Sequence, residues 1–215
     1  MPTAQSAHPG ESSTLPRPSV FLNLPYDRRF KSLYLAYIAG VSAFGMTPRT
    51  TLEISGSERR LDRIYNVIRE CSYSIHDLSR VQLDRRPPAT PRFNMPFELG
   101  LAVAHEKSGG KHAWFVFEEV DERLEKSLSD LKGSDVYIHH GKISSVFAKL
   151  GNAFLRQRPR PTVPQMTAIY FGLQDSVPRI MEETGADTLF EARPFRELAA
   201  LASGLTDRII LHKKP

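Results

Sequence analysis

VFLNLPYDRRFKSLYLAYIAGVSAF, residues 20–44, joins a strand pattern directly to a helix pattern. Val20–Leu24 is a short apolar run ended by Pro25, which is typical of a buried strand. Beyond it, apolar side chains recur at helical spacing until Gly45, a residue type that commonly ends helices. The helical face so formed carries Phe30, Leu33, Tyr34, Tyr37, Ile38 and Val41. A strand followed by an amphipathic helix is typical of an α/β fold, in which helices cover a parallel sheet.

The same alternation continues through much of the chain. Further strand patterns lie at Thr50–Ile54, Tyr73–Leu78, Ala113–Phe117 and Val136–Ile138. Further helix patterns are a segment from Leu61 to Cys71 with a cap at Ser57, a segment that runs to about Lys107, and a segment through Val146, Leu150 and Phe154. We therefore predict an α/β fold with a doubly wound, mainly parallel five-stranded sheet of the flavodoxin-like type.

Composition divides the chain into three parts. Residues 1–18 are rich in Pro, Ser and Thr without an apolar stretch, so we expect a disordered N-terminal segment and no signal peptide. Residues 19–158 hold the α/β pattern. The basic, Pro-rich stretch Arg156–Pro164 marks a boundary, and residues 159–215 are expected to form a helical C-terminal extension that opens at Thr162 and is interrupted at Pro178. The extension is too short for a strong core of its own, so we expect it to pack on the α/β domain or on a second subunit of a homo-oligomer.

The overall composition indicates where the protein is expected in the cell and which partners are not expected. Hydrophobic residues make up 40% and charged residues 25% of the chain, which is ordinary for a soluble protein. No apolar run approaches the ~20 residues of a membrane span, so we expect no membrane contact. The single cysteine, Cys71, excludes an internal disulfide framework and favours a cytoplasmic location. The net charge is +5, but the basic residues are scattered and no nucleic-acid motif is present, so nucleic acid is not the expected partner.

Polar side chains gather where the predicted strands end. Asn23, Tyr26 and Asp27 follow the first strand, and Asp77 and Ser79 close the third. In open parallel sheets, ligands bind outside the carboxyl ends of the strands. The loops after the first and third strands, with the turn after the fourth, are therefore expected to form one cleft.

Glu98 stands near the start of a predicted helix, in the sequence RFNMPFELGLA of residues 92–102. Pro96 suits the first helical turn, so Glu98 is expected in that turn, where the helix dipole favours the ionised carboxylate. Such a carboxylate can act as a nucleophile or stabilise a cation, and it is a poor proton donor. Acidic residues also favour helix starts for structural reasons alone. The polar loop ends, and Asp77 above all, favour the functional interpretation.

At these residues the chain resembles the nucleoside 2-deoxyribosyltransferase-like superfamily. The elements that carry the resemblance are, in order, Leu22-Asn23-Leu24-Pro25-Tyr26, Asp77-Leu78-Ser79 and Glu98-Leu99-Gly100-Leu101-Ala102. The resemblance spans residues 19 to about 117, and TIR-type NAD-cleaving domains of bacterial immunity have a related fold. It implies a flavodoxin-like protein that cleaves or transfers at the N-glycosidic bond of a nucleoside, nucleotide or NAD, without a cofactor.

The resemblance also implies roles for single residues. Glu98 would attack the anomeric carbon, and Asp77 would position the sugar hydroxyls or assist proton transfer to the departing base. The candidate binding residues are Asn23, Tyr26, Asp27, Ser79, Arg92, Asn94 and Met95. The first loop departs from the small-residue loop of the transferases. The arginines Arg80, Arg85, Arg86 and Arg92 either bind phosphate groups of a nucleotide or NAD, or form a solvated charged loop.

The remaining polar residues are expected to be structural. His76 adjoins Asp77 on a strand, and strand neighbours point to opposite faces, so His76 is expected to pack under a helix. His139 and His140 lack a third ligand at metal-binding spacing, so we expect no metal site. Cys71 ends an apolar helical stripe and is expected in the core.

Two other functions fit the same pattern. The cleft could bind a nucleotide signal without catalysis while the C-terminal helices relay its presence, or the chain could be a toxin or immunity component whose extension binds a partner. A retaining site with two carboxylates requires a separation of roughly 5 Å, although an Asp that positions the sugar could lie farther off. If Asp77 and Glu98 point into different regions, the enzyme hypothesis fails and the sensor hypothesis survives.

Overall fold

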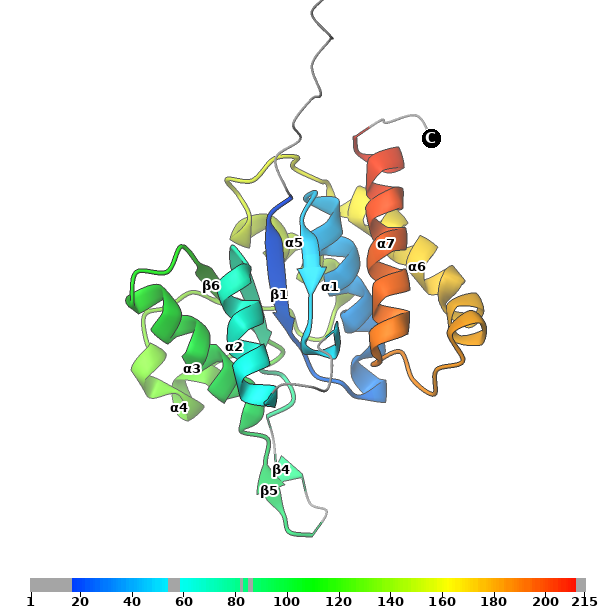
Figure 1. Ribbon diagram of the computed structural model, residues 1–215. Helices are drawn as coiled ribbons and strands as arrows, with labels where there is room; N and C mark the ends of the chain where they lie inside the picture. The colour runs from blue at the N-terminus through cyan, green and yellow to red at the C-terminus, as the bar shows by residue number, and fades with distance from the viewer. Residues whose placement is uncertain (1–16, 54–58, 82, 85–86, 212–215) are drawn as a thin grey trace, which may run out of the picture.

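The computed structural model describes residues 17–53, 59–81, 83–84 and 87–211 (Figure 1). The expected disorder of residues 1–16, the expected cap at Ser57, and Arg85 and Arg86 lie outside the described residues.

A five-stranded parallel sheet forms the centre of the molecule, with the strand order β2-β1-β3-β6-β7. Its strands are β1 (Ser19–Asn23), β2 (Thr47–Arg49), β3 (Tyr73–Asp77), β6 (Ala113–Glu118) and β7 (Val136–Ile138). A separate antiparallel hairpin, β4 (Leu83–Asp84) and β5 (Thr90–Pro91), projects away from the sheet (Figure 1). The predicted doubly wound α/β fold is confirmed.

Helices cover both faces of the sheet. Helices α1 (Lys31–Ala43) and α5 (Ile143–Ala153) pack with Leu22, Ile75 and Phe117 on one face. Helices α2 (Arg60–Glu70) and α3 (Asn94–Lys107) cover the other face, where Phe21 packs among their apolar residues, and α4 (Arg123–Ser127) lies beside α3. Because strand side chains alternate between faces, Asn23 shares the α2/α3 face with Phe21.

The C-terminal extension forms an outer layer over α1 (Figure 1). Its helices are α6 (Val163–Thr184) and α7 (Ala192–Ile209), and their apolar residues belong to the same core cluster as those of α1. Thr162 caps α6 together with Gln165, as the expected start at Thr162 requires. The extension therefore packs on the α/β domain, the first of the two expected arrangements.

Three sequence-based expectations are wrong in detail. Residues 17–18 are not part of a free lead-in, because the Arg17 guanidinium binds Asp207 of α7 at 2.7 Å. Pro178 does not interrupt α6, since Val177 and Ile180 on either side of it are buried and hold the helix together.

The second strand lies earlier than expected. It spans Thr47–Arg49, and Thr51–Glu53 forms a 3-10 turn, η2, in place of the strand expected at residues 50–54. The turn is closed by side chains, because the Glu53 carboxylate accepts the Thr50 N–H at 3.1 Å and the Thr50 hydroxyl accepts the Leu52 N–H at 3.2 Å.

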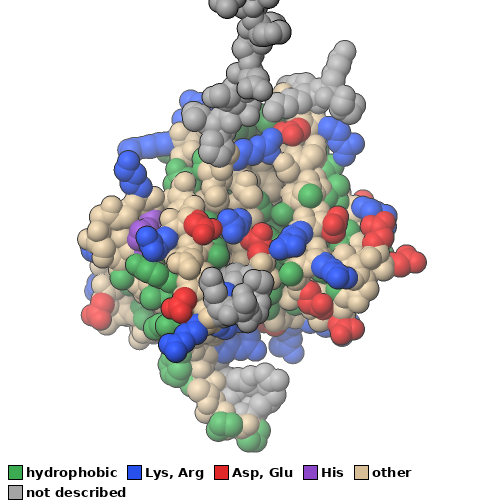
Figure 2. All heavy atoms as spheres, in the orientation of Figure 1, with side chains coloured by type: hydrophobic (Ala, Val, Ile, Leu, Met, Phe, Trp, Pro, Cys, Tyr) green, Lys and Arg blue, Asp and Glu red, His purple; other side chains and the backbone are tan. Residues whose placement is uncertain are grey.

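Cationic and anionic side chains are interspersed over the face seen in Figure 2. This agrees with the scattered basic residues of the sequence. Within the described residues, no helix is both long and apolar enough to cross a membrane.

Candidate functional site

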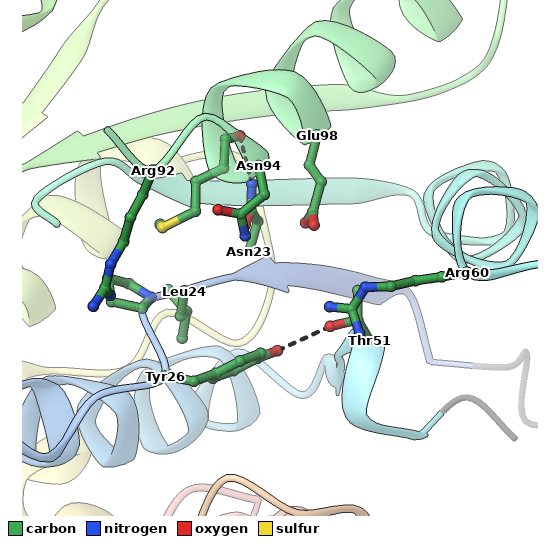
Figure 3. A pocket seen from close by; sticks show the side chains of 10 residues that line it. Asn23, Leu24, Tyr26, Thr51, Arg60, Arg92, Asn94 and Glu98 are labelled. Carbon is green, nitrogen blue, oxygen red and sulfur yellow. Dashed lines mark hydrogen bonds between the residues drawn. The ribbon is translucent and has the colours of Figure 1, made fainter. Parts of the chain in front are cut away.

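A polar pocket of about 360 Å³ opens at the carboxyl end of β1. Its walls come from the loop after β1, the turn η2, the start of α2 and the start of α3 (Figure 3). The lining residues are Asn23, Leu24, Pro25, Tyr26, Thr51, Arg60, Arg92, Asn94, Met95 and Glu98. We expected the cleft to lie outside the carboxyl ends of the strands, and the pocket does so at the loop after β1.

Most of the predicted site residues meet in this pocket. Those that line it are Asn23, Tyr26, Arg92, Asn94, Met95 and Glu98, and those that do not are Asp27, Asp77 and Ser79. The sequence-based analysis missed Thr51 and Arg60. Thr51 was assigned to a strand because it is β-branched, and Arg60 reads as an ordinary polar residue at a helix start. No local pattern marks either one, because Thr51 reaches the pocket from η2 and Arg60 reaches it from the start of α2.

Glu98 is the buried carboxyl of the pocket. Its side chain comes from α3 and points into the cavity, with 4% of the residue exposed (Figure 3). Among the described residues, no group donates a hydrogen bond to it or forms an ion pair with it. Burial raises the pKa of Glu98 to about 7, against a smaller lowering by the charge of Arg60.

This environment corrects the expected state of Glu98. Helix α3 begins at Asn94, so Glu98 lies in the second turn and not in the first. The dipole effect falls off within the first turn, and desolvation therefore dominates. The group is not held anionic over a wide pH range, and near neutral pH it can take up or release a proton.

Tyr26 forms the wall opposite Glu98 (Figure 3). Its hydroxyl lies 3.3 Å from the Thr51 hydroxyl, and burial raises its pKa to about 12, so it stays protonated. Its ring lies 5.8 Å from the ring of Phe190, measured between centroids. Phe190 belongs to the connection between α6 and α7, so the C-terminal extension supports the wall of the pocket.

Two cations flank the pocket. Arg60 and Arg92 approach it from opposite sides in Figure 3, and neither forms an ion pair within the described part of the chain. Arg60 is exposed and Arg92 is half-buried. Unpaired guanidinium groups beside a cavity attract anionic ligands such as phosphates.

Asp77 lies on the opposite face of the sheet. It is fully buried, and its Oδ2 accepts hydrogen bonds from the Tyr37 hydroxyl at 2.7 Å and from His139 Nε2 at 3.0 Å. The expectation that Asp77 and Glu98 face one cleft is therefore not met. Strand alternation is the reason, because β3 directs His76 toward α2 and α3 and the next residue toward α1.

The Asp77 cluster does not have the geometry of a catalytic triad. The Ser79 hydroxyl lies 3.2 Å from His139 Nε2, the same nitrogen that contacts Asp77. The other nitrogen, Nδ1, accepts the Gly141 N–H at 3.0 Å. A triad places the base and the acid on different ring nitrogens. His139 is structural, as expected, and so are the contacts of Ser79.

Asp27 and the loop after β6 also serve the local structure. The Asp27 carboxylate accepts the N–H groups of Arg29 and Phe30 and so caps a 3-10 turn. Glu118, at the end of β6, is paired with Arg123. Neither loop position lines the pocket.

The remaining polar residues lie close to their expected places. His76 is buried under the α2/α3 layer, and Cys71 is buried in the core beside it. Within the described residues, no group of three His, Cys, Asp or Glu is placed to hold a metal ion.

The sequence was compared with protein-family models and with curated proteins, and it matches none of them.

Proposed function

We propose that the protein cleaves the N-glycosidic bond of a nucleotide-type substrate, with Glu98 as the carboxylate that attacks the anomeric carbon. The observation that carries this proposal is the Glu98 side chain, buried without a hydrogen-bond partner among the described residues and directed into a polar pocket. A carboxylate kept from water is a stronger nucleophile than a solvated one, and the polar groups around it can hold a sugar and a base.

The reaction has two steps. A Glu98 oxygen forms a bond to the anomeric carbon while the bond from that carbon to the base nitrogen breaks, and its electron pair leaves with the base. Water then attacks the glycosyl ester, which releases the sugar, and the proton lost by the water goes to solvent. A second base in place of water would give transfer.

The separation of Asp77 from Glu98 counts against an enzyme in which both carboxylates act, so the proposal is the narrower one in which Glu98 acts alone. A mechanism with one carboxylate restricts the leaving group. With Asp77 on the other face of the sheet, Glu98 is the lone carboxyl among the described residues that line the pocket. A nicotinamide bound to ribose carries a positive charge and departs as a neutral base, so it needs no proton from a second acid. NAD and nicotinamide mononucleotide are therefore the preferred candidates, and Arg60 and Arg92 suit their phosphates.

Release of free base tests the proposal. Purified protein would be incubated with NAD, nicotinamide mononucleotide, AMP and unphosphorylated nucleosides, and the free bases would be separated and measured. We expect nicotinamide to be released by the native protein and not by Glu98→Gln. A folded native protein that releases no base from any of these compounds would refute catalysis.

A nucleotide sensor without catalysis is the second candidate. The contact between Tyr26 and Phe190 favours the sensor. A ligand that packs against Tyr26 would alter the packing of Phe190, and so the conformation of the connection between α6 and α7. Calorimetric binding of an intact nucleotide, with slower hydrogen exchange in residues 186–191 and no base release, would support the sensor over the enzyme. The homo-oligomer, the cytoplasmic location and a role in bacterial defence stay predictions, and light scattering would test the first of them.

A further inference from the structure

A chain of buried hydrogen bonds runs beneath α2 and α3 toward the pocket. It begins at the Cys71 carbonyl oxygen, which lies 2.8 Å from His112 Nδ1. His112 Nε2 lies 2.8 Å from the Ser74 hydroxyl, and that hydroxyl lies 2.8 Å from His76 Nε2. Ser74 and His76 are two residues apart on β3 and therefore face the same side of the sheet.

The chain ends at the pocket residue Asn23. His76 Nδ1 lies 2.9 Å from Asn23 Nδ2, and this nitrogen also donates to the Met95 carbonyl oxygen at 2.9 Å. Asn23 and His76 are register partners on neighbouring strands, which holds the two side chains together. Asn23, Ser74, His76 and His112 are all buried.

Backbone carbonyl groups at both ends determine the direction of every bond. A carbonyl oxygen can only accept, so His112 must carry its proton on Nδ1, and its Nε2 then accepts from Ser74. Because the Ser74 proton is used in that bond, the Ser74 oxygen accepts from His76 Nε2. His76 Nδ1 is therefore an acceptor, and it receives one of the two Asn23 amide hydrogens.

The other Asn23 amide hydrogen goes to Met95. Reversing the amide would place its oxygen against the Met95 carbonyl oxygen and against the lone pair of His76 Nδ1, which would cost two hydrogen bonds. Asn23 Oδ1 has no partner among the described residues, and Asn23 lines the pocket. This oxygen can therefore accept a hydrogen bond from a ligand.

Burial favours the uncharged form of both histidines, in agreement with the directions of these bonds. Burial lowers the pKa of His76 to about 3, and His112 reinforces the effect. Burial also lowers the pKa of His112. A charged His76 would also have to donate from Nδ1, and the Asn23 amide nitrogen that faces Nδ1 cannot accept.

We propose that Ser74, His76 and His112 form a positioning relay that fixes the Asn23 amide with its oxygen toward the pocket, so that the site selects ligands with a hydroxyl donor at that point. This rests on the proposed function, in which the donor is a hydroxyl of the ribose. Ser74 and His76 do not touch the substrate and act through Asn23. A buried acceptor that loses its donor is penalised, so the site should disfavour a sugar that lacks the hydroxyl.

Nuclear magnetic resonance tests the relay without any substrate. Long-range proton–nitrogen spectra at neutral pH should show neutral His76 with its proton on Nε2 and neutral His112 with its proton on Nδ1. Ser74→Ala should shift the His76 Nε2 resonance, because the proton on that nitrogen loses its acceptor, the Ser74 hydroxyl oxygen. Ser42→Ala is the matched control, because Ser42 is also a buried serine and its hydroxyl has no partner among the described residues. A proton on His76 Nδ1 in the native protein, or a His76 Nε2 resonance that does not move in Ser74→Ala, would overturn the relay.

A second measurement tests positioning. Turnover of nicotinamide mononucleotide and of its 2′-deoxy and 3′-deoxy analogues would be compared. We expect the native protein and Ser42→Ala to prefer the ribosyl form over at least one analogue, and Ser74→Ala to lose about fivefold of that preference, as expected for one hydrogen bond. Equal preference in Ser74→Ala and Ser42→Ala would refute the positioning role. A native protein that turns over none of these compounds would refute the proposed function. The relay would still be tested by the magnetic resonance spectra, which need no substrate.

Discussion

Tyr37 on α1 donates a 2.7 Å hydrogen bond to Asp77 at the end of β3, and both residues are fully buried. The bond ties the first helix to the centre of the sheet. Asp77 thereby serves the packing of the α1 face, and the pocket forms on the opposite face around Glu98.

Replacing this tyrosine should destabilise the fold. Tyr37→Phe leaves Asp77 with one hydrogen bond fewer, and we expect a loss of about 2 kcal/mol in the free energy of unfolding. Tyr34→Phe is the control, because the Tyr34 hydroxyl is also buried on α1 and has no partner among the described residues. Urea denaturation measures both. Equal losses in the two variants would contradict the structural role of the Tyr37–Asp77 bond.

Glu98→Gln should stabilise the protein in a pH-dependent manner. The folded pKa of Glu98, about 7, exceeds the ordinary value of 4.5, so the folded state binds the proton more tightly than the unfolded state. The free energy of unfolding therefore falls as pH rises from about 4.5 to about 7. The neutral glutamine escapes this loss, and at pH 8 we expect a gain of roughly 3 kcal/mol over the native protein. At pH 4 the two proteins should unfold at similar urea concentrations, and a pH-independent difference would contradict the burial of the charge.

The pH dependence of turnover should report the same carboxyl. The nucleophile must be ionised, so kcat/KM should rise with pH to a plateau above about 7. Arg60 lowers the pKa of Glu98, and Arg60→Gln should therefore move the midpoint of the profile to higher pH. Arg92→Gln is the matched control, because Arg92 lines the pocket without contributing to that pKa. We expect it to raise KM and leave the midpoint in place. A midpoint that moves equally in both variants would argue against a direct effect of Arg60 on Glu98.

The C-terminal extension should influence the pocket through Phe190. Phe190→Ala removes the ring that packs against Tyr26 and Tyr34, so we expect a higher KM and a loss of about 2 kcal/mol in stability. Phe171→Ala removes an exposed ring from α6 and should change stability by under about 1 kcal/mol and leave KM unaltered. An unchanged KM in Phe190→Ala would show that the extension supports the fold without shaping the site.

Local patterns in the sequence were sufficient for the architecture. Apolar runs and helical periodicity depend on neighbouring residues, so they predicted the α/β alternation and the strands at Tyr73–Asp77 and Val136–Ile138 to within a residue. The same reasoning placed Asn23, Tyr26 and Glu98 around one pocket, since parallel strands bring their carboxyl ends to one edge.

Only the tertiary structure decided which groups share an environment. The face of the sheet that each strand residue takes separates Asp77 from Glu98, and the turn at η2 brings Thr51 to the pocket. The pKa of Glu98 follows from desolvation by surrounding elements, which outweighs the helix dipole that the local sequence suggested. These properties depend on contacts between residues far apart in the chain, and a pattern of neighbouring residues carries no record of them.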